Sequence, residues 1–194
     1  MRIIGGRLRG RKLQTFKGSE VRPTADRVRE ALFNILGRKF IGANVLDLFA
    51  GTGALGIEAL SRGAQKAVFV DHSAHSLAVL RKNLDRCTLQ QYCRTIRWDI
   101  AKSLKCLVEY PETFDMVFLD PPYHCGLVPT ALQHLEKSGC LAPEAILAAE
   151  HEVGAAFEME SSGFTCTDTR RYGRTALSFF DYQPVSRCAR RWLD

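Results

Sequence analysis

The chain has 194 residues, of which 46% are hydrophobic and 25% charged, and its formal net charge is +6. This length and composition are typical of one globular domain with a sizeable core. Its longest apolar runs, about five residues, fall far short of the roughly 20 needed to cross a bilayer, and the first residues lack the apolar core of a signal peptide. Composition therefore excludes a membrane-spanning protein, and we expect a cytoplasmic one.

The cysteines and histidines give no sign of a disulfide framework or a metal site. The seven cysteines are odd in number and form no Cys-x-x-Cys pair, and the five histidines do not cluster. Reduced thiols in a cytoplasmic compartment fit this pattern. Zinc sites need closely spaced sets of cysteine and histidine, so we expect no metal.

Positive charge is concentrated near the N-terminus. Residues 1–40 contain 11 Lys or Arg and 3 Asp or Glu, a balance of +8, so the rest of the chain sums to −2. Glycines and apolar residues interleave with these basic residues, which a purely solubilising tail would not need. A basic extension on a near-neutral body is typical of a protein that binds nucleic-acid phosphates.

The first expected elements lie within this extension. Residues 2–16 alternate loosely between basic and apolar positions, which favours short strands or a hairpin. Thr24 can cap a helix whose apolar residues recur at helical spacing as far as Leu36, and Gly37 stops it. The arginines of this helix and of its lead-in mostly miss the apolar stripe.

From residue 43 onward, short apolar strands alternate with helices. The expected strands cover 45–49, 66–71, 94–99, 114–119 and 145–151, the expected helices cover 54–62, 73–86, 101–109 and 126–138, and a hairpin of 164–171 and 174–182 follows. This alternation predicts an α/β fold with a mostly parallel sheet, helices on both faces and a C-terminal antiparallel hairpin.

Acidic residues stand at or near the ends of four expected strands. They are Asp47, Asp71, Asp99 and Asp120. Ligands of parallel α/β sheets bind beyond the carboxyl ends of the strands. Because these ends share one edge of the sheet, we expect the four carboxylates to line a common ligand site.

A glycine-rich loop follows the first of these strands. In Gly51-x-Gly53-x-x-Gly56 the glycines let the backbone approach a ligand and turn sharply into a helix. The string also matches the dinucleotide fingerprint, with Asp71 as a ribose ligand, so a dehydrogenase is one interpretation. Against it, Asp47 precedes the first glycine by four residues, where it could meet an ammonium group, and no hydride-transfer constellation is visible.

The fourth acid opens the sequence Asp120-Pro121-Pro122-Tyr123. Two successive prolines remove two backbone donors and fix two φ angles, and the first holds Asp120 in an extended conformation. The stiff corner presents a carboxylate, free carbonyls and an aromatic ring, which can hold a planar base that carries an amino group. A lone corner of this kind would be read as a strand-terminating turn, but the upstream glycine loop favours a site.

Together, the acid series, the glycine loop and the Asp-Pro-Pro-Tyr corner resemble class I S-adenosylmethionine-dependent methyltransferases that modify an exocyclic amine of a base. The blocks Arg2-Ile3-Ile4-Gly5-Gly6, Arg22-Pro23-Thr24, Leu46-Asp47-Leu48 and Tyr172-Gly173 further resemble the RsmD family. That family comprises the 16S rRNA guanine-966-N2 methyltransferases of bacterial small-subunit biogenesis. The resemblance implies a Rossmann-like sheet of seven strands.

The resemblance also implies a domain division and a role for each motif. An RNA-docking extension, 1–40, would precede the methyltransferase domain, 41–183, and a basic tail, 184–194, would follow it. The methionine end of the cofactor would meet Asp47, Phe49, Ala50, Gly51, Thr52 and Gly53, the ribose Asp71, and the adenine Asp99 and Ile100. The target guanine would meet the catalytic residues Asp120, Pro121, Pro122 and Tyr123. RNA would meet Arg7, Arg9, Arg11, Lys12, Arg22, Thr24 and Arg27.

The expected protein is thus a monomeric enzyme that transfers a methyl group from S-adenosylmethionine to a guanine N2 in 16S rRNA. Its partner would be the RNA itself or an assembling small ribosomal subunit. Because Asp-Pro-Pro-Tyr also serves adenine-N6 enzymes, an adenine-N6 methyltransferase acting on DNA or RNA stays an alternative. An NAD-dependent oxidoreductase and a non-catalytic RNA-binding module are more distant alternatives.

Overall fold

The computed structural model describes residues 1–16, 23–108, 110–122, 126–155 and 163–184. Within them, seven strands form one sheet in the order β3-β2-β1-β4-β5-β7-β6. The strands are β1 (Asn44–Leu48), β2 (Lys66–Asp71), β3 (Cys93–Arg97), β4 (Phe114–Leu119), β5 (Leu141–Glu152), β6 (Phe164–Tyr172) and β7 (Thr175–Tyr182). The first five run parallel, and β7 is antiparallel to β5 and β6. The expected fold is confirmed.

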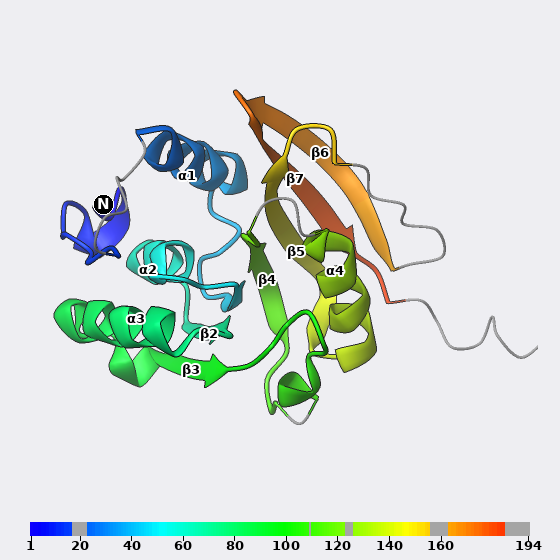
Figure 1. Ribbon diagram of the computed structural model, residues 1–194, viewed down its shortest axis with the longest axis horizontal. Coiled ribbons are helices and arrows are strands. Elements are labelled where there is room, and N and C mark those ends of the chain that lie inside the picture. The colour runs from blue at the N-terminus through cyan, green and yellow to red at the C-terminus, as the bar shows by residue number, and fades with distance from the viewer. Residues whose placement is uncertain (17–22, 109, 123–125, 156–162, 185–194) are drawn as a thin grey trace, which may run out of the picture.

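Helices cover both faces of this sheet (Figure 1). They are α1 (Pro23–Leu36), α2 (Ala54–Ser61), α3 (Ala74–Cys87) and α4 (Leu127–Ser138). Two hydrophobic clusters divide the core between the faces. The first contains apolar residues of α1, α2 and α3, and the second contains those of α4. Among the described residues, no helix is both long enough and apolar enough to span a membrane.

Alternation along the strands decides which cluster each side chain joins. In β4, Phe118 lies in the α1–α3 cluster and Leu119 in the α4 cluster. The chain starts at β1, builds outward through β2 and β3, and then returns to place β4 on the other side of β1. The junction of β1 and β4 is therefore the topological switch point, where ligands of such sheets bind.

The N-terminal segment, residues 1–16, folds back on itself like a hairpin, which is one of the two forms that its alternation favours, but it forms no regular strands. It closes through one antiparallel bridge, Arg2 to Lys12, around a 3₁₀ turn, Gly6–Leu8. Some of its backbone groups bond across the segment, such as the N–H of Ile3 to the carbonyl of Arg11 (3.0 Å), and others bond to α2. Glu58 accepts the N–H groups of Ile4 (2.8 Å) and Gly5 (2.7 Å), so these groups do not join a strand ladder.

The expected helix over 101–109 is wrong. Among the described residues of this segment, a 3₁₀ turn at Lys105–Leu107 is the only helical element. The indole N–H of Trp98 donates to the carbonyl of Ser103 (3.0 Å), an acceptor that an α-helix would use for itself. The N–H of Leu107 then bonds the nearer carbonyl of Leu104 (2.9 Å).

The fifth strand is longer than its apolar run indicates. It starts at Leu141, which pairs with Phe114 of β4, and a register irregularity separates that pair from the regular ladder that follows. The start of β5 contains a proline and a glutamate, which interrupt the apolar run, so the apolar pattern predicts a later start for this strand.

Candidate active site

The register of the parallel strands brings acidic residues to one level of the sheet. Leu48 of β1 lies opposite Leu119 of β4, which in turn lies opposite Ala149 of β5. The residues that come next along each strand are therefore neighbours across the carboxyl edge: Phe49, Asp71, Asp120 and Glu150. Asp99 comes two residues after β3, at the outer end of the same edge.

A cavity of about 250 Å³ lies at the switch point, and three carboxylates line it: Asp47, Asp120 and Glu150. Each stands two positions after a residue buried in the α1–α3 cluster, namely Val45, Phe118 and Ala148. Since strand side chains alternate, all three carboxylates project toward that face. The other lining residues are Met1, Phe16, Arg29, Phe49, Ala50, Gly51, Thr52, Ala54 and Leu55. We name this the acidic cavity.

The glycine loop that borders the acidic cavity is held by Asp71. This buried carboxylate accepts the N–H of Gly51 through Oδ2 (2.8 Å) and that of Ser73 through Oδ1 (2.8 Å). Gly53 has a φ of 82°, and a Cβ there would stand 2.2 Å from Leu80 Cδ1, so the position requires glycine. Each carboxylate oxygen has two acceptor sites, so Asp71 can still accept from a ligand hydroxyl.

Phe49 places backbone strain beside this loop. Its φ of 60° is uncommon for a residue with a side chain and costs on the order of 1–3 kcal/mol. The residue lines the acidic cavity, and its side chain packs against the α4 cluster. Strained residues of this kind concentrate at ligand sites, where the surrounding structure holds them in place.

Asp47 carries an electrostatic penalty that a cationic ligand would relieve. Its side chain is 2% exposed, and its Oδ2 accepts the N–H of Gly56 at 2.9 Å. Burial raises the pKa of Asp47 well above its ordinary value, the neighbours Asp120 and Asp71 raise it further, and the bond from Gly56 lowers it. The acidic cavity therefore favours a ligand with positive charge near this carboxyl.

Asp120 follows β4 directly and keeps an exposed surface, whereas Pro121 beside it is buried. Protein atoms crowd its carboxyl and Glu150 lies near it, and these two effects raise the pKa of Asp120 to about 7. Near neutral pH this group is divided between acid and carboxylate, so it can accept a hydrogen bond or a proton.

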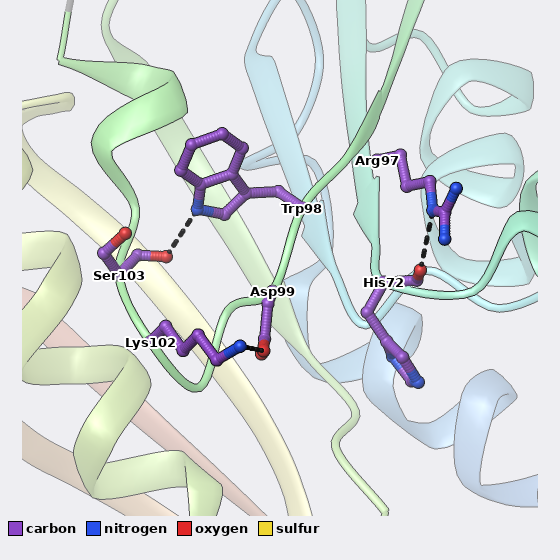
Figure 2. A pocket seen from close by; sticks show the side chains of 6 residues that line it. All are labelled: His72, Arg97, Trp98, Asp99, Lys102 and Ser103. Atoms are coloured by element: carbon purple, nitrogen blue, oxygen red, sulfur yellow. Dashed lines mark hydrogen bonds and ion pairs between the residues drawn. The ribbon is translucent and has the colours of Figure 1, made fainter.

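A second, more open pocket of about 530 Å³ lies at the end of β3 (Figure 2). It is lined by His72, Arg97, Trp98, Asp99, Lys102 and Ser103. Asp99 is 47% exposed, accepts the N–H of Ala101 (3.2 Å) and pairs with Lys102 (3.3 Å). The bond from Trp98 to Ser103 fixes the indole ring, and Figure 2 shows that this ring and the Asp99 carboxylate leave the chain in different directions, so the pocket has an aromatic ring and an acceptor as separate parts of its lining.

Asn83 of α3 ties the N-terminal segment to the glycine loop. The side chain is fully buried, and its amide group donates to the carbonyls of Thr52 (2.9 Å) and Gln14 (3.0 Å). Its oxygen accepts the N–H of Gln14 at 2.7 Å. Movement of the N-terminal segment is thereby coupled to the loop that borders the acidic cavity.

Arg29 of α1 differs from the solvent-facing arginine that the helical pattern predicts. It is 5% exposed, donates to the carbonyl of Arg2 (2.6 Å) and pairs with Asp26 (3.1 Å). Burial lowers the pKa of Arg29, whereas Asp26 and Glu58 raise it. Its Nε has no hydrogen-bond partner among the described residues. Because Arg29 lines the acidic cavity, it brings a fixed positive charge to the three carboxylates there.

The expected RNA-binding residues lie mainly on the surface. Those that the structure describes in full are exposed: Arg7, Arg9, Arg11, Lys12 and Arg27. Two of them contact α3 and the chain after it, because Arg11 donates to the carbonyl of Arg86 (2.6 Å) and Arg7 stacks over the Tyr92 ring (5.5 Å). Arg22, Tyr123 and the side chain of Thr24 lie outside the described residues.

Six of the expected site residues line the acidic cavity together, and three residues that the sequence did not single out join the two pockets. The six are Asp47, Phe49, Ala50, Gly51, Thr52 and Asp120. Ile100, expected near the adenine, is buried, and its carbonyl contacts Nδ1 of His134 at 3.0 Å. Glu150, Arg29 and Trp98 are the additions. Glu150 could have been found, because it lies near the end of the fifth expected strand, and acidic residues at the ends of the other expected strands had already been assigned to the ligand site. Arg29 has no comparable signal, since only the packing of α1 buries it.

Comparisons with known proteins agree with this geometry. The model of a family described as "Conserved hypothetical protein 95" matches residues 1–181. The chain is 42% identical over 153 residues to ribosomal RNA small subunit methyltransferase D of Escherichia coli (strain K12), covering 79% of this chain and 75% of that protein.

Two further similarities cover most of the chain. Ribosomal RNA small subunit methyltransferase D of Haemophilus influenzae is 41% identical over 154 residues, covering 78% of this chain and 79% of that one. The solved structure of yhhF from Escherichia coli superposes with a TM-score of 0.82 at 34% identity, over 95% of this chain and 99% of that chain.

Proposed function

The chain belongs to the family described as Conserved hypothetical protein 95, and on that premise we propose that it methylates the N2 amine of a guanine in 16S ribosomal RNA. The methyl donor is S-adenosylmethionine. Relatives at 41–42% identity are named ribosomal RNA small subunit methyltransferase D, which confirms the resemblance to the RsmD family drawn from the motifs. The target position, guanine 966, follows from that family.

One observation carries the proposal from the structure. The Asp120-Pro121 corner, suited to a planar amine, and the strained glycine loop, suited to a close ligand, border the same cavity at the switch point. A donor bound on the loop and a base bound at the corner would then meet inside it. The relatives named ribosomal RNA small subunit methyltransferase D favour this function over the oxidoreductase alternative.

The residues present fit S-adenosylmethionine. Asp47 offers a buried carboxylate whose penalty a ligand ammonium or sulfonium would relieve. Asp71 has acceptor capacity beyond its bonds from Gly51 and Ser73, which ribose hydroxyls could use, and the pocket that Trp98 and Asp99 line offers an aromatic ring and an acceptor for an adenine. When bound, the cofactor supplies a methyl group on positively charged sulfur, which makes that carbon strongly electrophilic.

The protein's own part in the reaction is to position the amine. The lone pair of a guanine N2 is delocalised into the ring, so the amine is a poor nucleophile until it turns pyramidal. Hydrogen bonds to the Asp120 carboxylate and the Pro121 carbonyl would hold the two N–H groups and direct the lone pair toward the methyl carbon. As the N–C bond forms and the S–C bond breaks, the nitrogen loses one proton, which the Asp120 carboxylate can accept.

The RNA would dock on the basic N-terminal segment, and the target base would leave its stack to enter the acidic cavity. The exposed Arg7, Arg9 and Lys12 would hold phosphates, which position RNA without reading its sequence. The substrate would be 16S rRNA, as naked RNA or as an assembling small subunit, and such a substrate supports a cytoplasmic enzyme.

Mass spectrometry of 16S rRNA nucleosides from cells with and without the gene tests this function. N2-methylguanosine should fall by one residue per 16S molecule without the gene, and purified protein with S-adenosylmethionine should restore it. Restoration by Asp120→Ala at the wild-type rate would contradict the proposed site. Appearance of N6-methyladenosine in its place would identify an adenine enzyme.

Neutralising Arg7 and Arg9 together to Gln tests the docking surface. Each lost phosphate contact should flatten the slope of log affinity against log salt by roughly 0.7 to 0.9, and RNA binding should weaken most at low salt. Affinity for S-adenosylhomocysteine should stay constant, because neither residue lines the acidic cavity. The matched control is Lys137→Gln, a charge on α4, which should leave the slope unchanged. An unchanged slope in the double variant would assign the N-terminal segment to another partner.

A further inference from the structure

Glu150 lines the acidic cavity, yet positioning the amine does not require it. It lies on β5, the strand next to Asp120, and its neighbour Ala149 pairs with Leu119. Asp120 comes directly after Leu119, so the two carboxylates occupy adjacent places along the sheet edge. Both project toward the α1–α3 face, where the cavity lies.

Asp120 and Glu150 place two carboxylates side by side in a cavity that Arg29 also lines. Strand register and the shared cavity place Glu150 beside Asp120, and its negative charge, after burial, contributes to the raised pKa of Asp120. Ionised carboxylates accept hydrogen bonds and cannot donate them. A ligand that presents several adjacent N–H donors can donate to both carboxylates at once.

The Watson–Crick edge of guanine has this donor pattern. Its N2 amine carries two hydrogens, and the adjacent N1 carries a third. The corresponding edge of adenine places an unprotonated N1 beside its N6 amine, so a carboxylate facing that nitrogen would meet a lone pair. A site built to accept hydrogen from one base rejects another base that lacks the donor, because its buried acceptor is then unpaired.

We propose that Glu150 is the residue that selects guanine over adenine, by accepting N1–H while Asp120 and the Pro121 carbonyl hold the neighbouring amine. This assignment rests on the proposed guanine methyltransferase function and names the feature that distinguishes it from an adenine-N6 enzyme with the same Asp-Pro-Pro-Tyr corner. Glu150 is a specificity-determining residue in this scheme, since it contacts the base but not the transferred carbon.

The sharpest test uses RNA in which 2-aminopurine replaces the target guanine. This base keeps an amine at C2 but has an unprotonated N1. Wild-type enzyme should methylate the guanine RNA and discriminate against the 2-aminopurine RNA by about a hundredfold or more in kcat/KM. The isosteric Glu150→Gln replaces an acceptor by an amide that can donate to N1. The preference of this variant for guanine should therefore fall by at least about tenfold, because kcat/KM decreases for the guanine RNA and increases for the 2-aminopurine RNA.

Binding gives a second readout that does not depend on methyl transfer. Fluorescence of 2-aminopurine rises when the base leaves its stack, so titration with S-adenosylhomocysteine present reports entry into the cavity. Glu150→Gln should hold the 2-aminopurine RNA at least about fivefold more tightly than wild type does. Glu152→Gln, two positions along β5 and not a cavity-lining residue, is the matched control and should leave both readouts at the wild-type level.

The outcomes separate this assignment from the proposed function. If wild-type enzyme fails to methylate the guanine RNA, or methylates an adenine, the proposed function and the assignment both fall. If wild type methylates guanine and Glu150→Gln keeps the same preference within threefold, Glu150 does not read the base, although the function stands. Thermal unfolding and S-adenosylhomocysteine affinity at wild-type values establish that the variant is folded, and Glu150→Asp serves as a second variant should Gln fail to fold.

Discussion

The two pockets at the carboxyl edge of the sheet use the same residue type for different chemistry. In the acidic cavity, Asp47 and Asp120 lie close to other carboxylates, and burial raises their pKa values. In the open pocket, Asp99 is exposed and already paired with Lys102. A buried carboxylate beside other carboxylates gains binding energy from a ligand that donates a hydrogen bond or brings positive charge. A carboxylate that is exposed and already paired gains less, so it contributes modestly to ligand affinity.

The supporting structure differs in the same way. The acidic cavity takes residues from β1 and the loop after it, the start of α2, the residue after β4, β5, α1 and the N-terminal segment, and these parts meet only in the folded chain. The open pocket is built mainly from the continuous stretch 97–103 after β3, with His72 added from the end of β2. We therefore expect substitutions in the acidic cavity to alter catalysis and those in the open pocket to alter cofactor affinity.

Asp120→Ala should have the largest effect. Loss of the acceptor that orients the amine should lower kcat by at least about a hundredfold, while the affinity for S-adenosylhomocysteine changes by less than about threefold. Single-turnover methylation and calorimetry measure the two quantities. A variant that turns over within a few fold of wild type would remove Asp120 from the mechanism.

Asn83→Ala should come next, because it acts on the acidic cavity from outside it. The substitution leaves Thr52 and Gln14 without their buried partner, at a cost of about 2 kcal/mol in the free energy of unfolding. Hydrogen exchange at Gln14 should accelerate, and affinity for S-adenosylhomocysteine should fall. Asn34→Ala, at an exposed position of α1, is the control. Equal free energies of unfolding for the two variants would mean that the hydrogen bonds between Asn83, Gln14 and Thr52 do not stabilise the fold.

Asp99→Ala should have a smaller effect, confined to binding. Its carboxylate is exposed and paired, so affinity for S-adenosylmethionine should weaken by about tenfold, or about 1.4 kcal/mol, with kcat at saturation nearly unchanged. Steady-state kinetics separate KM from kcat. A fall in kcat as large as that of Asp120→Ala would contradict the expectation that the open pocket affects cofactor affinity and the acidic cavity affects catalysis.

The pH dependence of stability should show the smallest effect. Because the folded-state pKa of Asp120 is raised to about 7, its protonation favours the folded state below about pH 4, and this contribution is lost as pH rises through 7. Asp120→Asn removes the repulsion, so it should stabilise the protein by about 1 kcal/mol near pH 8, a value reduced by water at the exposed carboxyl, and by nothing near pH 4. Thermal unfolding at both pH values measures this. In wild type, methyl transfer should rise with pH as the carboxylate forms.

Much of the fold and part of the site follow from local sequence. Alternation of short apolar strands and helices predicted the parallel sheet, because each element must bury one face and both patterns have fixed periods. Asp47, Asp71 and Asp120 could be assigned to one edge, since the carboxyl ends of parallel strands always meet there. The glycine loop was equally readable, because a turn as tight as the one at Gly53 excludes side chains.

Only the tertiary structure decided which groups share a cavity. From the sequence, residues 1–40 were expected to be a basic extension. In the structure, Ile4 bonds to α2, Gln14 bonds to α3, and Arg29 bonds to the carbonyl of Arg2 within the same extension. The expected helix over 101–109 gave way to a 3₁₀ turn because the Trp98 side chain took a backbone acceptor. Glu150 became a candidate site residue because strand register places it beside Asp120, which lies 30 residues earlier in the chain. Local patterns fix which face a residue presents, whereas hydrogen bonds and charge pairs depend on partners that the chain brings together only on folding.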